Sequence, residues 1–168
     1  MKNLILLLAV FTIYTSSLTA QTKKELKEQK AIEEYETMKV LINSRIYVFN
    51  ANWISTTRGQ KINISAGSNS IAVAQDSTKA AMQFFGEVNS IRFSGNEGVE
   101  FNNIMSDYQV NFNEKKKNII VSYRVKNKAE NYHISMTITR SGNTYVDVYS
   151  NIKRNVTYDG KVSAIKIE

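Results

Sequence analysis

Residues 118–149 read NIIVSYRVKNKAENYHISMTITRSGNTYVDVY, and this stretch decides the fold class. Apolar residues occupy every second position of 119–125 and again of 132–138. This period of two predicts strands that bury one face and expose the other to water. Ser141-Gly142-Asn143 separates the second run from a third, and such a turn between two runs is typical of a tight hairpin. The stretch therefore predicts an antiparallel meander.

Shorter runs with the same period occur on both sides of the meander. They begin near Tyr47, Ile62, Ile71, Met82, Ile91 and Tyr108, and a last one covers Val162 to Ile167. Together with the meander they make about nine to eleven short strands, and strands at such regular intervals are typical of all-β folds. We therefore predict, over residues 46–168, an antiparallel β-sandwich or a partly open β-barrel.

The stretch before these strands, residues 21–45, has a helical period instead. Tyr35, Met38 and Ile42 follow one another at spacings of three and four residues, which places them on one face of a helix. Glu and Lys alternate over the rest of the segment. We predict a single N-terminal α-helix that packs on the β domain, so that the two form one globular unit.

Residues 1–20 have the order of a secretory signal peptide. A positive start at Lys2 precedes an apolar run from Leu4 to Ile13, and mostly small or polar residues follow as far as Ala20. The run is shorter than the ~20 residues of a membrane-spanning helix. We expect cleavage after Ala20, no transmembrane span in the remaining chain, and an exported protein that is periplasmic or secreted.

Composition excludes several kinds of chemistry. The 168-residue chain has no Cys and one His, and its net charge is +7. Disulfides, thiol catalysis and zinc–cysteine sites are therefore excluded. The sequence also contains no nucleophile elbow, phosphate loop or dinucleotide fingerprint. We expect a non-catalytic protein with no metal site, no cofactor and no nucleic-acid partner.

Aromatic residues are numerous: nine Tyr, seven Phe and one Trp. Most of them take the inward phase of their strands, which a packed core explains. The alternative is a cavity whose aromatic walls bind an apolar or amphipathic small ligand, or a surface for an envelope protein partner. The candidate ligand-binding residues are Tyr35, Met38, Phe49, Trp53, Tyr123 and Tyr132.

Positive charge is concentrated in the C-terminal third of the chain. Residues 113–168 contain eleven Lys or Arg and five Asp or Glu. A basic surface of this kind attracts anionic glycans or lipid headgroups, whereas a solvated hairpin tip carries such residues without any partner. The candidate basic surface consists of Lys115, Lys116, Lys117, Arg124 and Lys126.

A hydrolase that uses a carboxylate pair is the remaining alternative. Glu97, Glu100 and Asp107 lie close together in the sequence around a loop, and glycoside hydrolysis uses two carboxylates. The simpler interpretation is that the three residues occupy turns and strand ends and have no catalytic role.

The single histidine, His133, lies on the polar face of its predicted strand. We expect Ser122 and Arg124 of a neighbouring strand to share that face. A general base needs an orienting carboxylate within hydrogen-bond reach, and the pattern predicts none there. No catalytic residue is therefore expected.

Several short motifs along the chain carry a family resemblance. In order they are Phe85-Gly86, Gly98-Val99-Glu100-Phe101, Asp107-Tyr108, Val125-Lys126, the Gly142 hairpin, Ser150-Asn151 and Tyr158-Asp159-Gly160. With a helix before it, the region from about Ile46 to Ile165 resembles the secreted bacterial family known as domain of unknown function 4251. Members often have Pro before the aromatic–Gly pair, where this chain has Gln83-Phe84. The resemblance implies an exported envelope protein of Gram-negative bacteria, with no assigned activity and no known site residue.

Overall fold

A computed structural model describes five stretches of the chain, with side chains from residue 23 onward: residues 2–56, 58–64, 69–85, 98–128 and 130–165. Within these stretches the chain forms one helix and nine strands. It divides into two compact units, Met1–Glu34 and Tyr35–Glu168, and the second unit holds the end of the helix and every strand. None of the helical residues that the structure describes forms a stretch long and apolar enough to cross a membrane.

Helix α1 spans Lys2–Asn43, and the strands follow it without a further helix among the described residues. The strands are β1 (Ile46–Thr56), β2 (Lys61–Asn63), β3 (Ser70–Ala74), β4 (Ser77–Met82), β5 (Val99–Asn113), β6 (Asn118–Asn127), β7 (Glu130–Thr139), β8 (Asn143–Ser150) and β9 (Val156–Ala164). Their order in the sheet is β2-β1-β3-β4-β5-β6-β7-β8-β9, and β9 also pairs with β1. That last pairing closes β1 and β3 to β9 into an antiparallel barrel, to which β2 is added as an extra strand.

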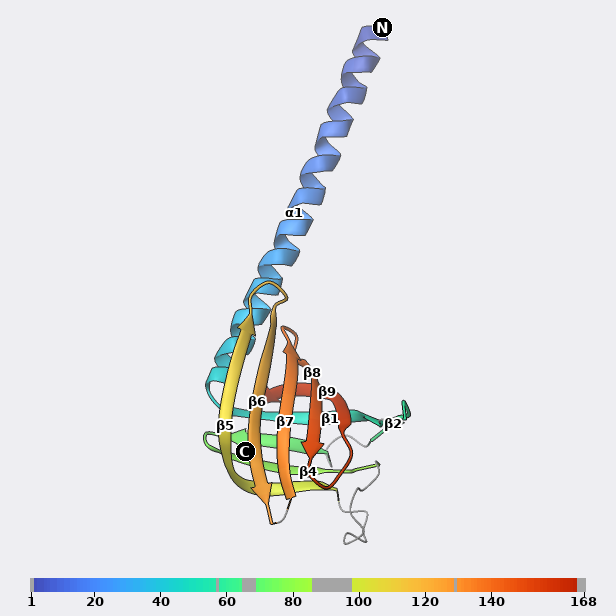
Figure 1. The fold of residues 1–168 in the computed structure, drawn as a ribbon. Coiled ribbons are helices and arrows are strands. Elements are labelled where there is room, and N and C mark those ends of the chain that lie inside the picture. Colours follow the sequence, from blue (N-terminus) through green and yellow to red (C-terminus); the bar gives the residue numbers. More distant parts are fainter. Residues whose placement is uncertain (1, 57, 65–68, 86–97, 129, 166–168) are drawn as a thin grey trace. The chain divides into compact units, whose positions relative to one another are not determined.

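The mainly antiparallel β fold is confirmed, and of the two predicted alternatives the barrel is confirmed and the sandwich is wrong. The barrel is closed, where the sequence predicted a partly open one. The long strand β1 pairs with β3 along its first half and with β2 along its second, and β9 lies along its other edge. Closure removes the free edges that an open sheet would expose. In Figure 1, β5 to β8 stand side by side, and β1 and β4 cross behind them. The strand expected near Ile91 lies outside the described residues.

The predicted meander is confirmed as β6, β7 and β8. Every second residue of β6 is buried from Ile119 to Val125, and β7 continues the same alternation. Gly142 lies in the β7–β8 hairpin with a φ of 83°, a conformation that glycine adopts without strain. The buried faces of the strands point into the barrel and form one hydrophobic core.

One residue expected to point inward lies on the outside of the barrel because of a β-bulge. The alternation that starts at Tyr47 predicts Trp53 on the buried face. The register between β1 and β9 shifts between Ala51 and Trp53, so that Ile54 is buried and Trp53 is 39% exposed. A bulge adds one residue and reverses the phase of the strand beyond it. Lys61 lies over the outward indole ring, with its Nζ 5.7 Å from the ring centroid.

Strand β4 begins earlier than the short strand expected from Met82 to Phe85. It runs from Ser77 to Met82, and Thr78 occupies an inward position of this strand. The Thr78 hydroxyl donates to the carbonyl of Ala72 at 3.0 Å and lies 3.2 Å from the Tyr123 hydroxyl. Because this inward residue is polar, the alternation of apolar and polar residues is interrupted, and the sequence does not predict the start of β4.

The last turns of α1 pack on the barrel, as their apolar spacing predicts. Tyr35 and Ile42 are fully buried, and Met38 is almost so. Lys39 Nζ lies 3.2 Å from Glu114 Oε1 in the β5–β6 hairpin. The helix itself begins at Lys2, well before residue 21. No Gly or Pro interrupts the residues that precede its end, so the helix continues through the expected leader.

Candidate functional site

Most of the candidate ligand-binding residues lie in the core. Tyr35, Phe49, Tyr123 and Tyr132 are at most 2% exposed, and Met38 is 9% exposed. The sixth candidate is the outward tryptophan of β1, so the structure does not bring all six together. The buried five belong to a single cluster of core side chains that pack against one another.

Several of the core tyrosine hydroxyls have polar partners within the barrel, whereas the buried Tyr35 hydroxyl has no hydrogen-bond partner among the described residues. The Tyr47 and Tyr108 hydroxyls lie 3.3 Å apart, and Lys153 Nζ donates to the Tyr132 hydroxyl at 3.2 Å. Burial raises the pKa of Tyr47, Tyr123 and Tyr132. These hydroxyls therefore stay protonated at neutral pH and act as internal hydrogen-bonding groups, which favours the packed-core interpretation.

The candidate basic residues do not form one patch. Lys115, Lys116 and Lys117 lie in the β5–β6 hairpin, whereas Arg124 and Lys126 lie on the outer face of β6. Seven strand positions separate the last hairpin lysine from the arginine, which is about 23 Å at ~3.3 Å per residue. One of the hairpin lysines, Lys117, lies over the buried Tyr35 ring at 5.3 Å.

The candidate carboxylates are also separated. Glu97 lies outside the described residues, and Glu100 and Asp107 are seven positions apart on β5, or about 23 Å along the strand. Carboxylate pairs in glycosidases lie at most about 9.5 Å apart. The structure therefore does not bring Glu100 and Asp107 together as such a pair.

A polar hollow of about 340 Å³ lies on the outer face of β5, β6 and β7. It is lined by Asp107, Gln109, Ser122, Tyr123, Arg124 and His133. Its volume is within the range of about 300–1,000 Å³ that is usual for small-molecule sites. The expected grouping of Ser122 and Arg124 with His133 is confirmed, because the register pairs Arg124 directly with His133.

A β-bulge in β5 shapes one side of this hollow. The register with β6 shifts between Ser106 and Gln109, and Asp107 has a φ of 55°. A positive φ is uncommon in residues other than glycine. Bulges and unusual backbone angles often occur next to functional sites, where they change the direction of a side chain. The turned Asp107 carboxylate lies 3.3 Å from Arg124 Nη1. Sequence reasoning missed the bulge, because strand β5 was expected only from Tyr108 onward.

His133, which lines the hollow from β7, has an aromatic neighbour on β8. His133 is paired in register with Tyr149, and the two rings stack with their centroids 5.7 Å apart. Tyr149 is 40% exposed, so its ring is available from solvent. An exposed aromatic ring therefore lies next to the hollow, stacked on its histidine.

Arg124 gives the hollow its chemistry. Its side chain is 69% exposed and makes one ion-pair contact of 3.3 Å to Asp107. A guanidinium has five N–H donors in a rigid fork that fits carboxylate and phosphate oxygens. The Gln109 amide and the Ser122 hydroxyl line the same space and can bind neutral polar groups. The arrangement suits a small ligand with one anionic group.

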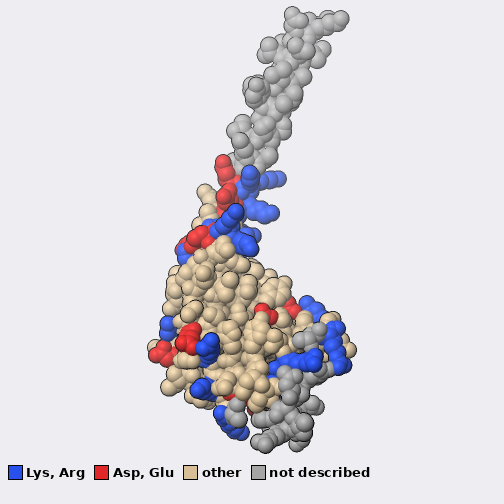
Figure 2. Space-filling view, viewed as in Figure 1, with Lys and Arg blue, Asp and Glu red and all other residues tan. Residues whose placement is uncertain are grey.

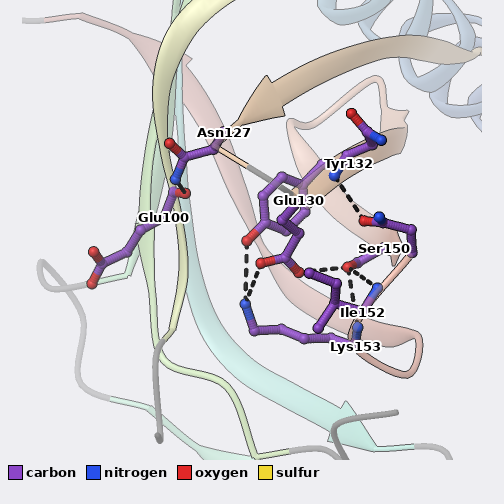
Figure 3. Close-up of polar contacts among 9 residues, drawn as sticks. Glu100, Asn127, Glu130, Tyr132, Ser150, Ile152 and Lys153 are labelled. Carbon is purple, nitrogen blue, oxygen red and sulfur yellow. Dashed lines mark hydrogen bonds and ion pairs between the residues drawn. The ribbon is translucent and has the colours of Figure 1, made fainter. Parts of the chain in front are cut away.

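A second polar cluster lies inside the barrel, at the start of β7 (Figure 3). Lys153 Nζ lies 2.7 Å from Glu130 Oε2, and both side chains are buried. Ser150 Oγ donates to the other Glu130 oxygen at 2.5 Å and accepts from the amides of Ile152 and Lys153. All of these contacts tie the β8–β9 loop to β7. The arrangement of the cluster therefore indicates a role in stabilising the fold.

The charge state of Glu130 follows from these contacts. Burial raises the pKa of its carboxyl, but hydrogen bonds from Lys153, Ser150 and Tyr132 outweigh burial and hold the pKa below its usual range. Glu130 is thus a carboxylate at neutral pH. The sequence offers no signal for this pair, because residues 127–131 read as a turn and Lys153 lies outside any strand.

Comparisons with known proteins place the chain in a family and a fold. The family model described as "Domain of unknown function (DUF4251)" matches residues 29–162. The chain is similar to the crystal structure of a DUF4251 family protein from Bacteroides eggerthii DSM 20697, with a TM-score of 0.64 and 21% identity. The similarity covers 80% of this chain and 89% of that one, and at this identity it shows the fold alone. The comparison with curated proteins finds no match.

Proposed function

This chain belongs to the DUF4251 family, and we propose that it is an exported, non-catalytic protein that binds a small anionic ligand in the hollow on the outer face of β5 to β7. The observation that carries the proposal is the bulge at Asp107, which turns this residue toward Arg124 and opens a polar space between three strands. Bulges that re-aim side chains are over-represented at functional sites.

The outer hollow is preferred to an interior cavity for a physical reason. Most of the residues expected to line such a cavity pack together in the core, where the Tyr123 hydroxyl lies 3.2 Å from the Thr78 hydroxyl and the Tyr132 hydroxyl accepts from Lys153. A ligand inside would have to displace these contacts. A ligand in the hollow needs only to share the exposed guanidinium of Arg124 with Asp107.

Export is supported by the leader-like order of residues 1–20. The absence of Cys from the whole sequence is consistent with a stability that rests on the barrel core. The non-catalytic assignment is supported by the arrangement of the hollow: Asp107 is the one carboxylate among the described residues that line it, and this carboxylate pairs with Arg124.

An NMR titration tests the proposed site. The ¹⁵N-labelled protein, expressed from the full chain, is titrated with sodium galacturonate, a small carboxylate with several hydroxyls. We expect the largest amide shifts at Gln109, Ser122 and Arg124. Shifts confined to core residues such as Phe49, or to the hairpin lysines, would count against the hollow.

Two charge-removing variants sharpen the titration. Arg124→Gln should weaken binding at least about tenfold, because a hydrogen bond to a charged group contributes ~1.5–3 kcal/mol. Lys115→Gln is the matched control, since it removes the same charge from the hairpin. Equal loss in both variants would mean that general positive charge, and not the hollow, binds the anion.

A further inference from the structure

We propose that the hollow is one end of a trough across β5 to β8 that binds a short acidic saccharide chain, an inference that rests on the proposed function. The floor of the trough is a row of residues at one level of the four strands. Register pairs them as neighbours: Gln109, Ser122, Ser135 and Asp147. The row spans three strand spacings, about 14 Å.

Two further rows of outward residues flank this floor. One wall contains Arg124, His133 and Tyr149, which are paired in register across β6, β7 and β8. The other wall contains Ile120, Thr137 and Tyr145, which are paired in the same way. Each wall lies two residues from the floor, so the walls are about 13 Å apart along the strands.

The centre of the floor carries the short hydroxyl groups of Ser122 and Ser135, and each wall carries one exposed tyrosine ring. Tyr145 is 52% exposed and Tyr149 is 40% exposed. A sugar ring has an apolar C–H face, which packs on an aromatic ring, and hydroxyl edges, which hydrogen-bond to Ser hydroxyls, Gln amides and carboxylates. A saccharide chain that lies along the trough can use both kinds of contact at once.

The charges of the trough determine the direction in which an acidic saccharide chain binds along it. Arg124 lies at the β5–β6 end, together with its ion-pair partner Asp107. Asp147 lies at the β8 end, where Thr157 Oγ1 donates to it at 2.6 Å. A sugar carboxylate therefore fits at the arginine end, and the neutral hydroxyl-rich end of the chain fits beside Asp147.

The surface is less suited to a protein partner. The surface over β5 to β8 is mostly neither acidic nor basic (Figure 2). Thr137 lies between Ile120 and Tyr145 in register. Asp147 lies between Tyr145 and Tyr149 along β8, so these large apolar side chains form no contiguous patch. Stable protein interfaces centre on a desolvated apolar cluster, whereas a row of hydroxyl and amide groups suits a hydrated polar chain.

Calorimetric titration with three probes tests the inference. They are galacturonate, its 1,4-linked tetramer, and maltotetraose as a neutral chain of the same length. The protein is again expressed from the full chain. We expect the acidic tetramer to bind at least about tenfold more tightly than the acidic monomer, and maltotetraose to bind more weakly than the acidic tetramer.

Two aromatic variants identify the trough. Tyr145→Ala should weaken the acidic tetramer about fivefold and leave the monomer unchanged, because only the longer chain reaches that wall. Trp53→Ala is the matched control: this exposed ring lies on β1, outside the trough. Equal losses in the two variants would overturn the assignment of the trough.

The remaining outcomes separate this inference from the proposed function. Equal affinity for monomer and tetramer, with a loss in Arg124→Gln, would overturn the saccharide chain and leave the anion site standing. Binding of the tetramer that is insensitive to Arg124→Gln would overturn the proposed site. No binding of any acidic probe would overturn both.

Discussion

The Asp107 carboxylate lies 3.3 Å from the Arg124 guanidinium, on a strand that bulges at Asp107. Both side chains are well exposed, so the pair contributes little to stability. Its position is more informative: Asp107 occupies the space beside Arg124 that an anionic ligand would use.

Asp107→Asn should therefore increase the affinity for galacturonate about threefold, because it removes a competing carboxylate from Arg124. The affinity is measured by calorimetric titration. Asp76→Asn is the control, since Asp76 pairs with Arg45 at 3.0 Å on an exposed surface outside the hollow. A decrease in affinity in Asp107→Asn would show that the carboxylate binds the ligand itself and not only the arginine.

Lys153→Met should lower the free energy of unfolding by about 3–5 kcal/mol, because it leaves Glu130 as a buried charge without its partner. Adding Glu130→Leu should recover much of this loss, since the uncompensated charge is then removed as well. Urea unfolding monitored by circular dichroism measures both variants. Lys115→Met in the exposed hairpin is the control and should change stability little. A double variant as unstable as Lys153→Met would contradict the ion-pair account.

Acid should weaken the barrel through Glu130. The pKa of this carboxyl in the folded protein is lower than its ordinary value of about 4.5, so its contribution to stability is fully present above about pH 4.5 and is lost as pH falls through the folded-state pKa. The Tm of the wild-type protein should therefore fall below pH 4.5 more steeply than that of Glu130→Gln, which has no proton to gain. Parallel Tm curves for the two proteins would show that Glu130 is not held ionised.

Trp53 and Phe49 should differ sharply in their effect on stability. Trp53→Ala should cost under about 1 kcal/mol, since the ring lies outside the barrel. Phe49→Ala should cost about 3–5 kcal/mol, since its side chain is fully buried. Because Trp53 is the only tryptophan, its fluorescence should also be quenched readily by iodide. Similar unfolding losses in both variants would place the indole in the core.

The leader should be absent from protein produced in a bacterium that exports it. Intact-mass spectrometry should give the mass of residues 21–168, because cleavage is expected after Ala20. An intact mass for residues 1–168 would remove the basis for export. Replacing Ala20 with Gln provides a control that should slow cleavage at this bond.

The regular parts of the fold could be predicted from the sequence, because their side chains alternate without interruption. Ile119 to Val125 gives the phase of β6, and this phase also places Arg124 on the outer face with His133. The prediction that Trp53 points inward was wrong because a bulge reverses the phase of β1. The alternation of apolar and polar residues does not show where an extra residue is inserted. Closure between β1 and β9 depends on contacts between residues at least 100 positions apart, which alternation cannot reveal.

The candidate site was only partly predictable for the same reason. Strand phase grouped Ser122, Arg124 and His133, but the approach of Asp107 depends on a bulge and a positive φ. The buried pair of Glu130 and Lys153 joins two segments that each read as loops. Charged residues next to turns are normally solvated, so nothing local distinguishes those that become buried.

A crystal structure of the protein with the galacturonate tetramer would locate the bound saccharide chain. We expect a sugar carboxylate within hydrogen-bond distance of the Arg124 guanidinium, with the chain crossing Ser122 and Ser135 toward Tyr145. A tetramer bound inside the barrel, or at the Lys115–Lys117 hairpin, would contradict this expectation.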